Sequence, residues 1–92
     1  MDKNGLAELR RLVEQVMYAP TKKGAQQSIR RLEFMAATVK VEIDGYDSGK
    51  LSEVIGYAKE AAGRVRNKEH WIARGEQCWY VFENAVRREL ES

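Results

Sequence analysis

Apolar residues recur at intervals of three and four along almost the whole chain, and this periodicity constrains the fold more than any other feature. Such spacing lines apolar side chains along one face of an α-helix, because the helix has about 3.6 residues per turn. The first periodic segment predicts a helix over residues 5–18, which Asn4 can cap. Pro20 ends this helix, since the residue before a proline disfavours the α conformation, and Thr21 can cap the next one.

The second predicted helix covers residues 22–44 and is apolar on two faces. One face presents a core stripe, and Gly45 stands where a left-handed C-cap would follow it. This stripe consists of Ile29, Leu32, Ala36, Val39 and Ile43. At about 100° per residue, Phe34, Ala37 and Val41 fall on the opposite side. We expect this outer face to contact either a second copy of the chain, as a homodimer or higher oligomer, or a protein partner. The alternative is that Phe34 is a single exposed aromatic residue without a binding role.

A β-strand is the alternative for residues 38–44, where apolar and charged side chains alternate and β-branched residues are frequent. The only other segment with strand-like character is 78–82, and it also fits a helical period. Because an isolated two-stranded sheet is marginally stable, the pattern favours helix over strand.

Two further helices are predicted, over residues 49–66 and 67–90. The third follows a cap at Asp47 or Ser48, and its stripe consists of Leu51, Val54, Ile55, Ala58, Ala62 and Val65. The fourth follows the potential cap Asn67, and its stripe consists of Trp71, Gly75, Cys78, Phe82, Ala85 and Val86. Short connections make neighbouring helices antiparallel, so the chain is expected to form one all-α domain, an antiparallel up-down bundle of four helices over residues 1–92. A continuous helix across 64–72 is the alternative, which would give a three-element hairpin that completes its core with a second copy.

Composition and charge exclude several classes of protein. At 92 residues the chain is long enough for one core only. Its net charge of +2 is too small for general nucleic-acid coating. The single cysteine allows no internal disulfide, and no stretch is apolar enough to cross a membrane. We therefore expect a soluble, cytoplasmic protein.

The residues that carry chemistry in enzymes are nearly absent. His70 and Cys78 lie about 12 Å apart along a helix, too far to form a catalytic pair. The chain lacks the additional His or Cys ligands of a zinc site, and Asp44 and Asp47 lack the further acids of a calcium-binding loop. No glycine-rich phosphate loop is present. The sequence predicts no enzymatic activity, no cofactor and no metal.

Four residues around the start of the last predicted helix resemble the Arg-polar-His motif of HEPN ribonucleases, which are also helical bundles. They are Arg64, Arg66, Asn67 and His70. The spacing departs from the motif, because only three residues separate Arg66 from His70 and because Val65 rather than a polar residue follows Arg64. The resemblance implies RNA cleavage that depends on His70.

A second set of residues is similar to the small helical-hairpin proteins with which phages sequester cyclic-nucleotide immune signals. The set consists of Tyr18, Pro20, Gly24, Ile29, Arg30, Lys50, Leu51 and Ala58. The resemblance implies a small phage or bacterial protein in which aromatic and basic residues near the start of the second helix bind phosphate and base.

Up-down topology brings basic residues together at one end of the bundle, where the first and third helices finish and the second and fourth begin. The residues expected there are Tyr18, Lys22, Lys23, Arg64, Arg66, Lys68, His70 and Trp71, with Arg30 and Arg31 about two turns along the second helix and Glu69 as the only acid among them. The opposite end collects Asp44, Asp47, Glu89 and Glu91. Because helix N-termini add positive partial charge, we expect the basic end to bind an acidic protein surface, a nucleotide or a nucleic-acid phosphate. Alternatively, these cations only stabilise the end of the third helix.

From these features the sequence predicts a small non-enzymatic interaction protein, such as a regulator, inhibitor or assembly adaptor. The second hypothesis is a binder of small anionic ligands such as cyclic nucleotides. The third is a HEPN-like ribonuclease.

Overall fold

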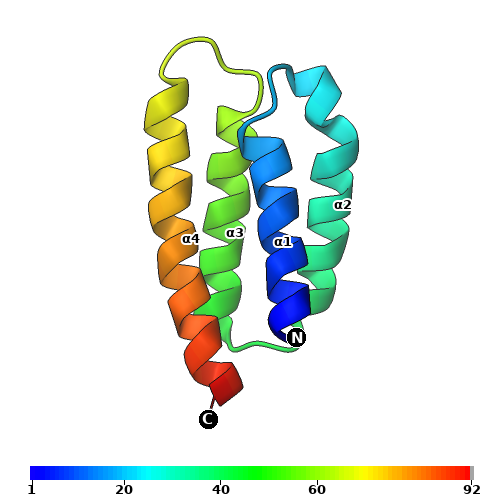
Figure 1. The fold of residues 1–92 in the computed structure, drawn as a ribbon, viewed down its shortest axis with the longest axis vertical. Helices are drawn as coiled ribbons and strands as arrows, with labels where there is room; N and C mark the ends of the chain where they lie inside the picture. Colours follow the sequence, from blue (N-terminus) through cyan, green and yellow to red (C-terminus); the bar gives the residue numbers. More distant parts are fainter. Residues whose placement is uncertain (92) are drawn as a thin grey trace.

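Four helices form where the periodicity predicts them, and they make an all-α, antiparallel up-down bundle (Figure 1). The computed structural model describes residues 1–91. The helices are α1 (Lys3–Met17), α2 (Lys22–Lys40), α3 (Gly45–Ala61) and α4 (Lys68–Glu91). No β-strand occurs among the described residues, so the strand alternative for 38–44 is wrong. None of the described helices is long and apolar enough to span a membrane.

In cross-section the four helices lie at the corners of a rhombus, and α1 and α3 face each other across its short diagonal. Helix α3 packs closely against α4 and also contacts α1 and α2. Helices α2 and α4 occupy the far corners and do not pack against each other, as their outer positions in Figure 1 show. The contact between α1 and α4 is slight. One edge of the bundle is therefore more open than the other three.

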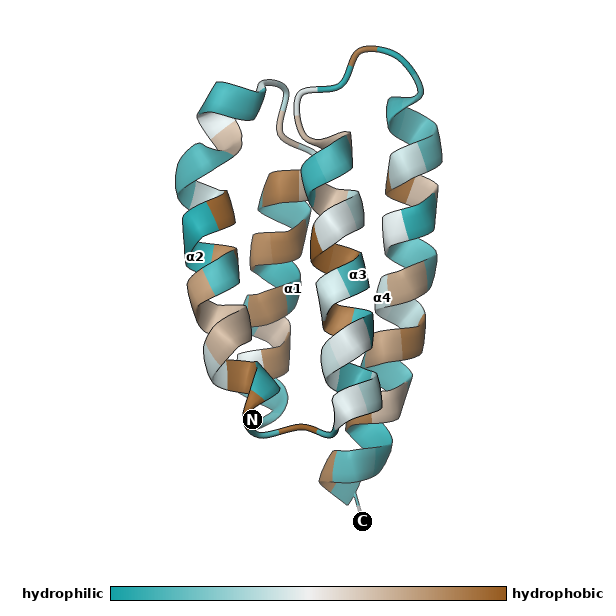
Figure 2. Cartoon of the chain, turned by 180° about the vertical axis from the view of Figure 1, so that it is seen from behind, coloured by the Kyte–Doolittle hydropathy of each residue, from teal (hydrophilic) through white to brown (hydrophobic). Residues whose placement is uncertain are grey.

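The core is built from the apolar stripes, which appear as bands along each helix between hydrophilic residues (Figure 2). Its largest fully buried side chains include Phe82, Leu9 and Met17. Trp79 is also buried, at 5% exposed. Gly75 permits a close approach, because a Cβ there would lie 2.5 Å from Cε of Met17. The helical period thus selects the core residues of all four helices.

The connection between α2 and α3 begins and ends at different residues from those predicted. Helix α2 ends at Lys40, so Val41 lies in a short connection rather than on the helix. The Asp44 side chain accepts a hydrogen bond from the Asp47 backbone N–H at 2.8 Å, which makes Asp44 the cap of α3 in place of Asp47 or Ser48. This cap requires an extended backbone at Asp44, so the second helix cannot continue to residue 44 and Gly45 begins α3 instead of terminating α2.

The cap of α1 also differs, while that of α2 is as predicted. Asp2, not Asn4, caps α1, because its carboxylate accepts a hydrogen bond from the Gly5 N–H at 2.8 Å. Thr21 caps α2 in the same way, through the Gly24 N–H at 3.0 Å. In both caps, a side-chain oxygen accepts a hydrogen bond from the backbone N–H three residues later, which has no partner within the helix.

Helix α3 ends at Ala61, five residues before the predicted end. Gly63 has a left-handed φ of 70°, which stops the helix, and Asn67 before α4 has a φ of 59°. Residues 62–67 therefore form a loop, and the continuous helix across 64–72 is excluded. Val65 leaves the apolar stripe on which it was predicted and is 96% exposed.

Candidate functional site

Two loops meet at the end of the bundle where α1 and α3 finish, at the top of Figure 1. The Gly63 N–H donates a hydrogen bond to the Ala19 carbonyl at 3.0 Å. A Cβ on Gly63 would lie 2.4 Å from the Lys22 backbone nitrogen, so only glycine fits there. This contact places residues 18–23 beside residues 62–68, as the topology predicts. We call this region the basic end, and its residues are Tyr18, Lys22, Lys23, Arg64, Val65, Arg66, Lys68, His70 and Trp71.

Two cations of the basic end stabilise the fold. The Lys68 ammonium group donates hydrogen bonds to the carbonyls of Ala61 at 2.8 Å and Ala19 at 3.0 Å. Nε of Arg64 donates to the Glu60 carbonyl at 2.9 Å, and its Nη2 pairs with the Glu60 carboxylate at 2.7 Å. These contacts satisfy carbonyls at the ends of α1 and α3 and offset their partial negative charge. Lys68 and Arg64 thus have an intramolecular role.

Three other cations have no such role. Lys22, Lys23 and Arg66 are exposed and form no ion pair or side-chain hydrogen bond with the described residues. The pKa of Glu60 is lowered mainly by its hydrogen bond from Arg64, and the charge of Lys22 adds a smaller effect. Lys22 and Lys23 lie in the first turn of α2, where the helix dipole disfavours positive charge. These cations remain available to an anion from outside the chain.

The aromatic side chains of the basic end already make contacts within the chain. Trp71 is half-buried, and the Arg64 guanidinium lies over its ring at 5.2 Å from the centroid. The His70 ring meets Trp71 edge-on at 5.2 Å, and Tyr57 lies at 6.1 Å. The Tyr18 hydroxyl donates to Glu76 at 3.5 Å, and partial burial raises the pKa of Tyr18. A base that stacked on this face of Trp71 would have to displace Arg64.

A second surface lies along the groove between α1 and α2. Phe34 is 79% exposed at this groove, next to the half-buried Met35 and the buried Leu12. Arg30 and Arg31 line it from α2. Arg30, which was expected about two turns along the second helix from the basic end, lines this groove beside Phe34.

The predicted outer face of the second helix is divided in the structure. Phe34 lines the groove between α1 and α2, whereas Ala37 lines a shallow groove between α2 and α3. Val41 is 84% exposed in the connection that follows α2. The three residues therefore do not form one continuous face, because α2 ends early and its two sides meet different neighbours.

At the opposite end, Asp44, Asp47 and Glu89 bring three carboxylate oxygens within 4.8 Å of one another. Asp47 is only 2% exposed, and the Asp44 N–H donates to Glu89 at 3.3 Å. A hydrogen bond with Asp47 is the main cause that raises the pKa of Glu89. Carboxylate oxygens are the ligands that Ca²⁺ and Mg²⁺ prefer, so these are the described residues that could hold a divalent cation. The up-down topology predicted that these three residues share one end of the bundle, but not that their carboxylates come this close together.

The environment of Cys78 is not that of an activated nucleophile. Its thiol is half-buried and contacts the Lys50 carbonyl at 3.6 Å. Burial raises the pKa of Cys78, which favours the unreactive neutral thiol.

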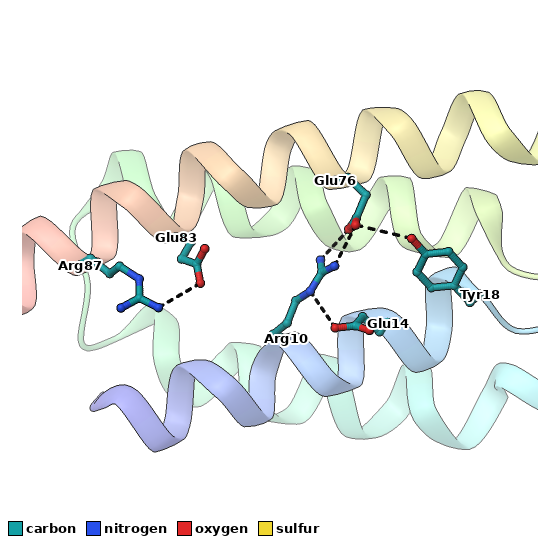
Figure 3. A network of polar contacts seen from close by, with 6 residues as sticks. All are labelled: Arg10, Glu14, Tyr18, Glu76, Glu83 and Arg87. Carbon is teal, nitrogen blue, oxygen red and sulfur yellow. Dashed lines mark hydrogen bonds and ion pairs between the residues drawn. The ribbon is translucent and has the colours of Figure 1, made fainter.

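Sequence reasoning missed an ion-pair network that crosses the open edge between α1 and α4 (Figure 3). Arg10 donates two hydrogen bonds to Glu76, at 2.6 and 2.8 Å, and a third to Glu14 at 2.9 Å. Its guanidinium also lies 5.6 Å from the centroid of Trp79. No local sequence pattern pairs Arg10 with Glu76, because they lie far apart in the chain. The early end of α3 was a different case, since a glycine such as Gly63 directly after the alanines is a recognisable signal for the end of a helix.

No protein family model, curated protein or solved structure matches this chain. A four-helix bundle supports many unrelated functions, so the fold does not select one. Only the chemistry of the described residues bears on the function.

Proposed function

We propose that this chain is a small, non-enzymatic interaction protein that acts as a regulator, inhibitor or assembly adaptor by binding an acidic protein surface at its basic end. The observation that carries the proposal is the division among its cations. Arg64 and Lys68 donate hydrogen bonds to carbonyls at helix ends, whereas Lys22, Lys23 and Arg66 are exposed without an ion pair among the described residues. A partner with acidic side chains would neutralise these three charges.

Val65 favours a protein over a small ligand. Its side chain is 96% exposed in the loop between α3 and α4, with an arginine on either side. Burying a valine at an interface contributes about 1.5 kcal/mol or more, which a protein surface can supply. A nucleotide would need a stacking surface, and Arg64 already covers a face of Trp71.

The electrostatic part of such binding has a defined signature. Complementary charges at the rim of an interface raise the association rate and make it sensitive to salt. We therefore expect an affinity that falls as ionic strength rises. As part of the same proposal we place the interaction in the cytoplasm, since the single cysteine allows no internal disulfide.

The test is a paired charge reversal, measured on the partner captured from a lysate of the source organism. Lys23→Glu with Arg66→Glu is expected to weaken binding at least about tenfold and to flatten the salt dependence between about 50 and 200 mM. The control is Lys3→Glu with Arg88→Glu, which makes the same change in net charge on exposed residues of the other end. Val65→Ser, which leaves the charge unchanged, is expected to weaken binding as well. Equal affinities for the two double variants would contradict the proposal.

Two further assays separate the other hypotheses. A rise in melting temperature with cyclic nucleotides that Lys23→Glu removes would support a binder of small anionic ligands instead. RNA cleavage that His70→Ala abolishes would support a ribonuclease.

A further inference from the structure

The groove between α1 and α2 is lined differently from the basic end, since it combines apolar and cationic side chains along its length. We propose that this groove binds one amphipathic helix of a partner protein, whose apolar stripe covers Phe34 and whose flanking acidic residues pair with Arg30 and Arg31. This surface is separate from the basic end, so the inference goes beyond the proposed function and stands without it.

The apolar part of the groove fits a helix. Phe34 is 79% exposed, which leaves most of a large aromatic side chain in water. Met35 is half-buried beside it, and Leu12 of α1 closes the floor at 3% exposed. Two antiparallel helices form a groove that the ridge of a third helix can occupy, with anchors at intervals of three and four residues.

The charge of the groove selects an acidic occupant. Arg11 forms an ion pair with Glu8, and its Nε donates a hydrogen bond to the Glu8 carboxylate at 2.9 Å. The Arg11 contact is the main cause that lowers the pKa of Glu8, and the nearby charge of Arg31 contributes less. Arg30 and Arg31 form no ion pair with the described residues. The rim therefore keeps two arginines that form no ion pair with the glutamate of this groove.

The same charges disfavour a second copy of the chain as the occupant. A twofold dimer through this groove would bring Arg30 and Arg31 of both copies to one interface, while each Glu8 remains paired with Arg11. Like charges at an interface are repulsive, whereas glutamates on a partner helix would pair with the arginines in two-pronged contacts.

The experiment is an NMR titration of the full chain with a designed helical peptide of about 18 residues. The peptide carries leucines at intervals of three and four and glutamates along both flanks. We expect shifts concentrated on the residues of the groove. A peptide of the same composition with shuffled leucines, and one with lysine in place of glutamate, are expected to bind at least about tenfold more weakly.

Matched variants test each part of the surface. Phe34→Ala, and Arg30→Glu with Arg31→Glu, are each expected to weaken binding of the glutamate peptide at least about tenfold. Tyr80→Ala removes another exposed aromatic, 66% exposed and outside the groove, and is expected to leave the affinity unchanged. Because Phe34 is exposed, its loss should not unfold the bundle, which circular dichroism would verify. The Lys23→Glu, Arg66→Glu protein is expected to bind the peptide like the wild type, so failure at the basic end and failure here are distinguishable.

Three results would overturn the inference. They are equal binding of the shuffled and ordered peptides, no binding of the glutamate peptide at the concentrations used for NMR, and a wild-type dimer that Phe34→Glu converts to monomer. The last result would identify a second copy as the occupant.

Discussion

Two glycines illustrate how a single residue supports this bundle in different ways. Gly63 has a φ of 70°, and a Cβ there would contact backbone atoms of Lys22, which cannot move independently. Gly75 lies within α4, and a Cβ there would contact the far end of the flexible Met17 side chain. The first position is restricted by the backbone and the second by a side chain, so they differ in their tolerance of alanine.

We expect Gly63→Ala to lower the free energy of unfolding by about 2–4 kcal/mol, from left-handed strain and from contact with the Lys22 backbone. Gly75→Ala is the control and is expected to change it by less than about 1 kcal/mol, because the gain in helix propensity offsets the displacement of Met17. Urea unfolding of both variants measures the difference. Equal stability of the two variants would show that the loop contact at Gly63 contributes little.

At the scale of helices, the weak point of the bundle is the edge between α1 and α4. The backbones of these helices approach each other at few positions, and a network of polar side chains crosses this edge. The paired hydrogen bonds from Arg10 to Glu76 cross this edge, and Tyr18 adds a longer contact to the same carboxylate (Figure 3). The side chains of Arg10 and Glu76 remain 26% and 37% exposed, so solvent weakens their attraction.

Glu76→Gln is expected to lower the free energy of unfolding by about 1 kcal/mol at neutral pH. The Arg10 hydrogen bonds lower the pKa of Glu76 from its ordinary 4.5 in the folded protein. The stabilisation is therefore present above the unfolded pKa and is lost as pH falls through the folded pKa. Urea unfolding at about pH 7 and about pH 3 should show the gap between wild type and variant shrinking in acid.

The control for this pair lies on the same helix. Glu83→Gln removes a contact to Arg87 one turn away, and its expected cost is only about 0.3–0.5 kcal/mol. A cost for Glu76→Gln no larger than for Glu83→Gln would mean that the network does not hold α1 to α4.

Across the whole molecule, the up-down topology separates charge along an axis of 42 Å. Lysines and arginines gather where α2 and α4 begin, and the carboxylates of Asp44, Asp47 and Glu89 gather at the other end. A chain with a net charge of only +2 therefore carries a basic end and an acidic end. The acidic end joins the start of α3 to the end of α4 through the hydrogen bond from Asp44 to Glu89.

We expect Glu89→Gln to raise the melting temperature at neutral pH. The hydrogen bond with Asp47 raises the pKa of Glu89 above its ordinary 4.5, so the protonated form is favoured in the folded protein. This stabilisation is present below the unfolded pKa and is lost as pH rises through the folded pKa. Glutamine keeps an acceptor for the Asp44 N–H, adds a donor for Asp47 and carries no charge at any pH.

The measurement is a series of thermal melts upward from about pH 4. The gain of Glu89→Gln over the wild type should grow as the pH rises. A Glu89→Gln protein less stable than the wild type at neutral pH would contradict this interpretation.

The number, order and direction of the helices, and most of the core, were predictable from the sequence. Residues three and four apart share a helix face whatever surrounds them, so Leu32, Leu51 and Phe82 could be assigned to the core from their spacing alone. The stop at Pro20 and the cap at Thr21 are equally local. Helix ends without a proline were less predictable, because Asp44 competed with Asp47 and Ser48 for the same role.

The roles of the charged and exposed residues were decided only by the tertiary structure. The sequence placed Arg64, Lys68 and Lys23 at one end. Only the packed loops bring carbonyls to Arg64 and Lys68, and they leave Lys23 without an ion pair among residues 1–91. Phe34 and Ala37 share a side of α2 by periodicity, yet they face different grooves because α1 and α3 flank that helix. Helical periodicity is a property of neighbouring residues, whereas these roles depend on the relative positions of helices that lie far apart in the chain.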